Sequence, residues 1–141
     1  MADVRFFTPQ EAKAALPAVR PLLAELRESF TAYRFAREQV DELSAMFGED
    51  PARVAGHPQE REAMEWRERA AKADARVRET IAQLNELGAD VKDPILGLID
   101  FYAKRDDGEV VLLCYRDDEE DLRFWHSMDT GFAGRRPLDE L

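Results

Sequence analysis

Apolar residues recur along the first part of the chain at alternating intervals of three and four positions. They are Leu16, Val19, Leu23, Leu26, Phe30 and Tyr33, then, after an interruption at Arg37, Val40, Leu43 and Phe47. This spacing is typical of coiled-coil helices that pack at a shallow angle. The segment GEDPARVAGHP, residues 48–58, predicts a break after this helical region.

The residues around position 8 predict the start of a helix. Thr8 can cap the first turn, Pro9 suits the first helical position, and Glu11 can bond back to the backbone of the cap. Proline disfavours helical geometry in the residue before it. Pro17 and Pro21 therefore predict that a short N-terminal helix ends here and that a longer helix follows.

A second helix is predicted from about Gln59 to Leu87, with Gly88 as its stop. Its apolar positions are Ala63, Trp66, Ala70, Ala73, Val77, Ile81, Leu84 and Leu87. Acidic residues precede basic ones by four positions on another face, as expected of a solvated surface. Two long helices with a short connection predict an antiparallel helical hairpin over residues 9–88.

The pattern changes after Gly88. Residues 97–104, GLIDFYAK, and 109–116, EVVLLCYR, predict two strands, and RDDG at 105–108 predicts the turn between them. Residues 122–126 predict a third strand. We therefore expect an α+β protein in which the helical hairpin precedes a small antiparallel β-hairpin or three-stranded meander over residues 91–138. The length fits a single domain, residues 1–141.

The charge balance limits the classes of partner. The chain has 20 basic and 30 acidic residues, a net charge of −10, and one short basic cluster, Arg135-Arg136. Such a chain repels phosphate backbones and anionic membranes, so we expect neither nucleic acid nor a membrane as partner. Cys114, the only cysteine, excludes an internal disulfide. With no signal-peptide pattern at the N-terminus and no 18-residue apolar run, we expect a cytoplasmic protein.

The segment RFWHSMDTGFAGRRPL, residues 123–138, holds the best single candidate for chemistry, His126. An imidazole titrates near neutral pH and is a common metal ligand, and Trp125 beside it could stack on a flat ligand. The alternative is a histidine that fills space at a strand end and bonds a backbone carbonyl. The absence of an HxxH or HxxE companion favours that alternative.

Asp100 is the second candidate, because a carboxylate inside a strand is costly if it is buried without a partner. An ion pair with Arg135 or a hydrogen bond to His126 would satisfy it. A carboxylate that orients an imidazole serves both a metal site and a general base. We therefore predict a ligand site of Asp100, Trp125, His126 and Arg135, with a divalent metal, if one binds, on Asp100 and His126. The alternative is an exposed aspartate on an edge strand.

Cys114 is predicted to lie on the opposite face of the sheet. A turn of two or four residues at 105–108 puts Asp100 and Cys114 on different faces, and only a bulge or a three-residue loop would reunite them. Cys114 is therefore interpreted as a small core residue. The GFAGRRP segment, residues 131–137, either presents donors to an anion or closes a turn in which Arg135 or Arg136 pairs with an internal acid.

Three segments carry a resemblance to a known family: VKDPILGLIDF at 91–101, VLLCYR at 111–116 and FWHSMDTGFAGRRPL at 124–138. Together with FFTPQEAKAALPAVRPLL at 6–23, they resemble a family of small bacterial proteins catalogued as domain of unknown function 2203. The resemblance implies no activity. It does imply that the histidine segment is a feature of the family.

Two functional hypotheses follow. The first is a non-catalytic binding or protein-interaction module, a homodimer if Leu22, Phe35 and Met46, which lie off the main apolar stripe, bury against a second copy. The second is a small metal- or anion-dependent enzyme with a site built on Asp100, His126 and Arg135. The sequence identifies no small-molecule ligand, and fold alone decides neither hypothesis.

Overall fold

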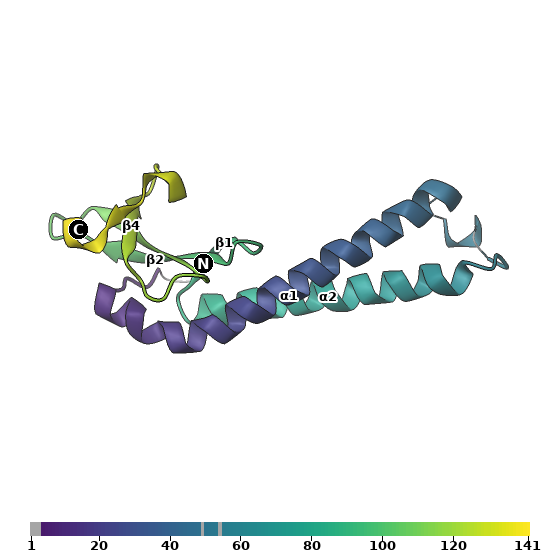
Figure 1. Ribbon diagram of the computed structural model, residues 1–141, viewed down its shortest axis with the longest axis horizontal. Coiled ribbons are helices and arrows are strands. Elements are labelled where there is room, and N and C mark those ends of the chain that lie inside the picture. The colour runs from purple at the N-terminus through teal and green to yellow at the C-terminus, as the bar shows by residue number, and fades with distance from the viewer. Residues whose placement is uncertain (1–3, 49, 54) are drawn as a thin grey trace. The chain divides into compact units, whose positions relative to one another are not determined.

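The computed structural model describes residues 4–48, 50–53 and 55–141, and its elements are labelled in Figure 1. The chain divides into two compact units. Unit 1 takes in the described residues of Met1–Arg27 together with Thr80–Leu141, and unit 2 takes in those of Glu28–Glu79. The interpretation of the chain as a single domain stays a prediction.

The first helix, α1, covers Pro9–Phe47 and begins as the sequence predicts. The backbone N–H of Glu11 donates to Thr8 Oγ1 at 3.1 Å, and the backbone N–H of Thr8 donates to Glu11 Oε1 at 3.0 Å. This reciprocal pair satisfies two donors that a helix N-terminus otherwise leaves without partners.

The predicted break at the prolines is wrong, because α1 continues through Pro17 and Pro21. Both prolines are exposed and lie four residues apart, on one face of the helix. The carbonyl groups that lose their hydrogen bonds to proline therefore face water, which limits the cost. The opposite face holds the helix in place through buried apolar side chains, Leu16, Val19, Leu23 and Leu26.

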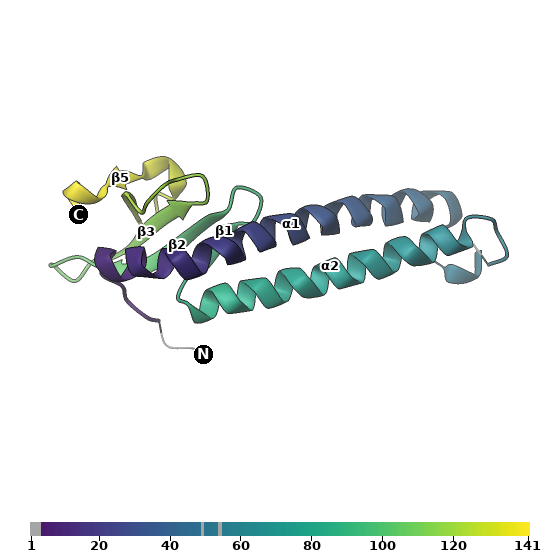
Figure 2. The ribbon, with the colours of Figure 1, turned by 60° about the horizontal axis from the view of Figure 1, so that its bottom comes forward.

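Unit 2 is an antiparallel helical hairpin, as predicted. The part of α1 in this unit lies beside the corresponding part of α2, Glu60–Glu86, and a short 3-10 helix, Pro51–Arg53, lies in the connection (Figures 1 and 2). The apolar stripe passes Arg37 through its neighbour Ala36, which is buried. Across the described residues, no helix is long and apolar enough to span a membrane.

Unit 1 contains a five-stranded antiparallel sheet in the order β1-β2-β3-β4-β5. Its strands are Asp90–Asp93, Leu98–Lys104, Val110–Arg116, Phe124–Ser127 and Arg136–Pro137, and 3-10 helices cover Phe132–Gly134 and Leu138–Glu140. The α+β class is confirmed. The sheet has two more strands than the predicted meander, because β1 and β5 are short and carry no apolar alternation.

The two faces of the sheet have different surroundings. On one face the Phe101 ring lies 4.9 Å from that of Phe7, and Arg20 Nε donates to the Tyr115 hydroxyl at 3.2 Å. This face packs against the first turns of α1 and the segment before it. Side chains alternate along each strand, so Asp100 and Cys114 project from the other face.

Candidate functional site

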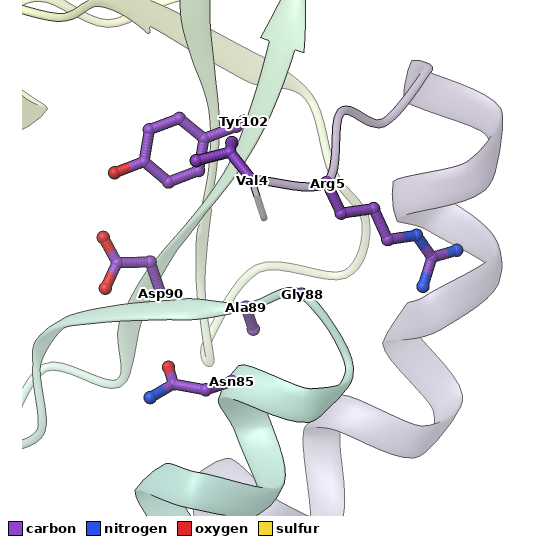
Figure 3. A pocket seen from close by; sticks show the side chains of 7 residues that line it. All are labelled: Val4, Arg5, Asn85, Gly88, Ala89, Asp90 and Tyr102. Carbon is purple, nitrogen blue, oxygen red and sulfur yellow. The ribbon is translucent and has the colours of Figure 1, made fainter. Parts of the chain in front are cut away.

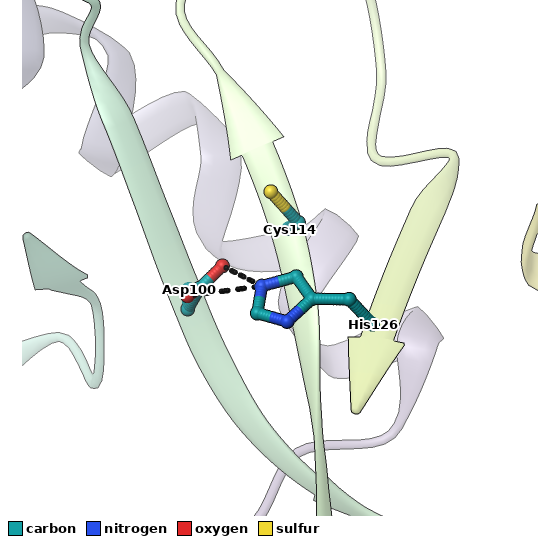
Figure 4. A group of neighbouring side chains, drawn as sticks. All are labelled: Asp100, Cys114 and His126. Atoms are coloured by element: carbon teal, nitrogen blue, oxygen red, sulfur yellow. Dashed lines mark hydrogen bonds and ion pairs between the residues drawn. The ribbon is translucent and has the colours of Figure 1, made fainter. Parts of the chain in front are cut away.

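Asp100, Cys114 and His126 lie on three neighbouring strands and point toward one another (Figure 4). Asp100 on β2 is directly opposite Cys114 on β3, and Leu112 on β3 is opposite His126 on β4. Leu112 and Cys114 are two residues apart and share a face. The register therefore brings all three side chains to the face away from α1.

The prediction that Cys114 lies on the opposite face from Asp100 is wrong. The backbone N–H of Arg105 donates to the Glu109 carbonyl at 2.9 Å, and that of Gly108 donates to the Arg105 carbonyl at 2.8 Å. These bonds leave a loop of three residues, 106–108, which Gly108 closes with a φ of 89°. This loop length is the exception under which Asp100 and Cys114 share a face.

The cluster is buried and closely spaced. The relative exposures of Asp100, Cys114 and His126 are 1%, 0% and 4%. His126 Nε2 lies 3.2 Å from each carboxylate oxygen of Asp100, and His126 Nδ1 lies 2.8 Å from the Ser127 carbonyl oxygen. One potential metal-ligand atom from each of the three residues lies within 4.8 Å of the other two. The predicted contact between Asp100 and His126 is therefore present, and it is direct.

The hydrogen bonds define how protons are held. The Ser127 carbonyl can only accept, so Nδ1 of His126 carries a proton. Nε2 and the carboxylate of Asp100 can then attract each other only if one further proton lies between them. Burial raises the pKa of the Asp100 carboxyl, and the charge and hydrogen bond of His126 oppose that rise. The pair therefore shares one proton between Nε2 of His126 and the carboxylate of Asp100.

Cys114 is a protonated thiol in these surroundings. Burial, reinforced by the nearby Asp100 carboxylate, raises the pKa of the thiol to about 12. The thiolate is the reactive form of cysteine, so Cys114 of the metal-free protein is a poor nucleophile at neutral pH. A bound metal ion would reverse this preference, because a coordinating thiol is deprotonated.

Arg135 forms its ion pair with Glu119 and not with Asp100. Its Nη2 atom lies 2.5 Å and 2.7 Å from the two carboxylate oxygens of Glu119, and its guanidinium carbon lies 4.1 Å from the Phe124 ring centre. The side chains of Arg135 and Glu119 are both 13% exposed. The site therefore contains Asp100 and His126, while Arg135 pairs with an internal acid, which is one of the two arrangements expected for the GFAGRRP segment.

Trp125 lies on the other face of β4 from His126. Its ring is buried, and its Nε1–H donates to the Pro137 carbonyl at 3.0 Å. The guanidinium carbons of Arg105 and Arg136 lie 5.1 Å and 5.5 Å from the ring centre. Trp125 therefore cannot stack on a ligand held by Asp100 and His126.

A pocket of about 340 Å³ lies elsewhere in unit 1 (Figure 3). Its lining residues are Val4, Arg5, Asn85, Gly88, Ala89, Asp90 and Tyr102. In Figure 3 the guanidinium of Arg5 points away from the polar ends of Asp90 and Tyr102. Because these polar groups do not converge on one point, the buried cluster is the stronger candidate site.

Two members of the site were missed from the sequence. A two- or four-residue turn places Cys114 on the wrong face, although the glycine at the end of RDDG is also compatible with a three-residue loop. Ser127 contributes a backbone carbonyl, which any residue supplies, so residue type gives no signal for it.

The fold and the site define an α+β protein with a helical hairpin and a buried Asp–Cys–His cluster on an antiparallel sheet. The chain belongs to the family described as uncharacterized conserved protein (DUF2203), whose model matches residues 5–138. No curated protein and no solved structure matches the chain. The family assignment confirms the resemblance carried by the three segments and carries no activity with it.

Proposed function

We propose that the protein binds one divalent transition-metal ion, with zinc the best fit, through Asp100, Cys114 and His126. The observation that carries the proposal is the convergence of a carboxylate, a thiol and an imidazole within 4.8 Å at a buried position. Zinc is bound in proteins by these three ligand types. Calcium and magnesium prefer all-oxygen sites, so this ligand set disfavours them.

Charge balance supports a divalent ion. A thiolate and a carboxylate carry two negative charges, and an imidazole ligand is neutral, so the occupied centre has no net charge. A buried centre without net charge avoids most of the cost of placing an unpaired ion in a protein interior.

The hydrogen bond from His126 supports the same proposal. A metal-binding histidine usually donates its second ring N–H to a carbonyl or carboxylate, which fixes the tautomer and aims the other nitrogen at the ion. The Ser127 carbonyl, 2.8 Å from Nδ1, supplies that acceptor. The lone pair on Nε2 is then directed toward Asp100 and Cys114.

The number of protein ligands leaves one position of a tetrahedral ion open. Within the described part of the chain, no fourth His, Cys, Asp or Glu joins the group. Structural zinc sites usually have four protein ligands, whereas sites with three hold a water or an exogenous ligand in the fourth position. The proposed centre therefore has the ligand count of a site at which the ion can bind a small molecule.

The test is titration of chelator-treated protein with cobalt(II), whose absorption spectrum reports thiolate ligation. We expect one cobalt ion per chain and a sulfur-to-metal absorption band that Cys114→Ser abolishes. His126→Ala should weaken cobalt binding more than about 100-fold. This exceeds the loss expected when a residue that only hydrogen-bonds to a metal ligand is removed. His57→Ala, which removes the other, exposed histidine, is the matched control. A spectrum without a thiolate band, or equal losses in both histidine variants, would refute the proposal.

A second candidate is self-association through unit 2. Phe35 and Met46 are 54% and 64% exposed and lie eleven residues apart on α1, which places them on the same side of the helix. A second copy of the chain would cover them. Sedimentation velocity over a concentration series should show a dimer that Phe35→Ser weakens and that Ile95→Ser, at an exposed apolar position of unit 1, leaves unchanged. A monomer at all concentrations would refute this candidate.

A further inference from the structure

A second set of polar groups surrounds a pocket of about 290 Å³ in unit 1. The lining residues are Arg105, Glu109, Trp125, Ser127, Thr130, Gly134 and Arg136. Trp125 alternates with His126 along β4, so this pocket and the proposed metal centre lie on opposite faces of that strand. We propose that the pocket binds a small ligand through an oxyanion, either a phosphate or a carboxylate group, held by Arg105 and Arg136.

The indole ring of Trp125 positions both arginines. Their guanidinium carbons lie 5.1 Å and 5.5 Å from the ring centre, which are cation–π distances. The ring is itself fixed, because it is buried and its N–H is bonded to the Pro137 carbonyl. Two guanidinium groups are therefore held at one pocket before a ligand arrives, which lowers the entropy lost on binding.

Arg136 has donors available to a ligand. Among the described residues, no carboxylate lies within ion-pair distance of Arg136, whereas its neighbour Arg135 is paired with Glu119 inside the protein. Arg105 contacts one acid, Glu109, at 3.3 Å. A guanidinium carries five N–H donors in a planar fork that fits the oxygens of phosphate and carboxylate, so Arg105 also keeps free donors.

The turn after β4 also lines the pocket. A Cβ atom on Gly134 would lie 2.4 Å from Cβ of Thr130, so only glycine permits this close approach. Thr130 Oγ1 and Ser127 Oγ lie 3.0 Å apart at the same pocket, and the Ser127 hydroxyl donates to Asp129 Oδ1 at 2.9 Å, so these bonds hold the turn in place. The GFAGRRP segment thus supplies the glycine, the turn and one arginine of the pocket.

Glu109 is the acidic residue in the pocket lining. Substitutions that remove the charge of Arg136 and the charge of Glu109 should therefore change the affinity for an oxyanion in opposite directions. Removing the Arg136 charge should weaken oxyanion binding about tenfold, the effect of losing one charge-assisted hydrogen bond. Removing the Glu109 charge should strengthen binding, because the acid competes for Arg105 and repels the ligand. A folding defect cannot produce tighter binding, so Glu109→Gln separates local charge from damage to the fold.

The experiment uses the full chain carrying Trp66→Phe, which leaves Trp125 as the only tryptophan. Inorganic phosphate and citrate are titrated separately, at constant ionic strength and with a chelator present, by Trp125 fluorescence and calorimetry. We expect saturable binding that Arg136→Gln weakens, Glu109→Gln strengthens and Arg123→Gln leaves unchanged. Arg123 is an exposed arginine outside the pocket, 3.7 Å from Glu120.

Each result decides the proposal. Binding of phosphate alone assigns the pocket to phosphorylated ligands, and binding of citrate alone assigns it to carboxylates. The chelator removes any bound metal ion, which separates this pocket from an anion bound at the proposed metal centre. The proposal is overturned if neither anion binds saturably, if Arg123→Gln weakens binding as much as Arg136→Gln, or if Glu109→Gln fails to strengthen it.

Discussion

Replacing Cys114 with alanine should change how the stability of the protein depends on alkaline pH. Burial raises the pKa of this thiol from 9.0 to about 12. In the unfolded chain the thiol loses its proton near pH 9, whereas in the folded chain it keeps the proton. The unfolded state therefore binds fewer protons in this range, and the free energy of unfolding must fall as the pH rises.

The size of the effect follows from the two pKa values. A separation of one pH unit corresponds to about 1.4 kcal/mol, so about three units correspond to about 4 kcal/mol if the pH passes through the whole range. This is a large fraction of the stability of a typical domain. Because Cys114 is completely buried, solvent does not screen the effect as it would at the surface.

The assay is urea unfolding between about pH 8 and pH 11 with a chelator present, comparing the wild-type protein with Cys114→Ala. Lysine and tyrosine residues also titrate in this range, but they do so in both proteins and cancel in the comparison. The wild-type curve should fall more steeply above about pH 9. Parallel curves would refute the reasoning, since they would mean that the thiol ionises as readily in the folded chain as in the unfolded one.

Three further predictions concern the buried polar groups of unit 1. Glu119→Ala should lower the free energy of unfolding, measured by urea unfolding, by about 3 kcal/mol, because it leaves the guanidinium of Arg135 buried without its partner. A change below about 1 kcal/mol would mean that water replaces the carboxylate. Zinc binding should release about two protons per ion, one from the Cys114 thiol and one that Asp100 and His126 share. Calorimetry in two buffers of different ionisation enthalpy measures this number. Release of fewer than about one proton per ion would argue against thiolate ligation. In metal-free protein, the double variant Asp100→Leu/His126→Leu should be at least as stable as the wild type. His126→Leu alone should lower the free energy of unfolding by about 3 kcal/mol, because it leaves the Asp100 carboxyl buried without its partner. Equal losses in the single and the double variant would show that the pair itself stabilises the fold.

The helical part of the fold was predictable because its signals are local. The apolar stripe, the Thr8–Glu11 capping bonds and the stop before Gly88 each depend on residues within about one or two helical turns. Pro17 and Pro21 do not end the helix, because a proline does not break a helix at every position. Its cost depends on whether the freed carbonyl groups reach water, and that depends on packing of the opposite helix face.

The sheet and the site were predictable in part. Asp100 could be recognised because a carboxylate in a strand requires a partner, and His126 because the chain offers few other imidazoles. The face of Cys114 depended on a single residue of loop length, since one residue more or less reverses the face of every side chain on a strand. The sequence does not identify Glu119 as the partner of Arg135, because Glu119 lies in a separate loop and no local sequence pattern relates the two residues.

The free-energy cost of burying Asp100, Cys114 and His126 bears on whether the cluster binds a ligand or only stabilises the fold. Leu98 and Leu112, on the same sheet face, are buried without polar partners, so apolar side chains fit these surroundings. Burial of Asp100 works against its ionised form, as the raised pKa of its carboxyl indicates, and contacts with His126 and Cys114 offset only part of that cost. A cluster retained for stability alone would gain from apolar replacements. A divalent ion, by contrast, would use the carboxylate, the imidazole and the thiol together and would release the protons that now occupy them. This energetic difference is the reason why we propose metal binding for all three residues.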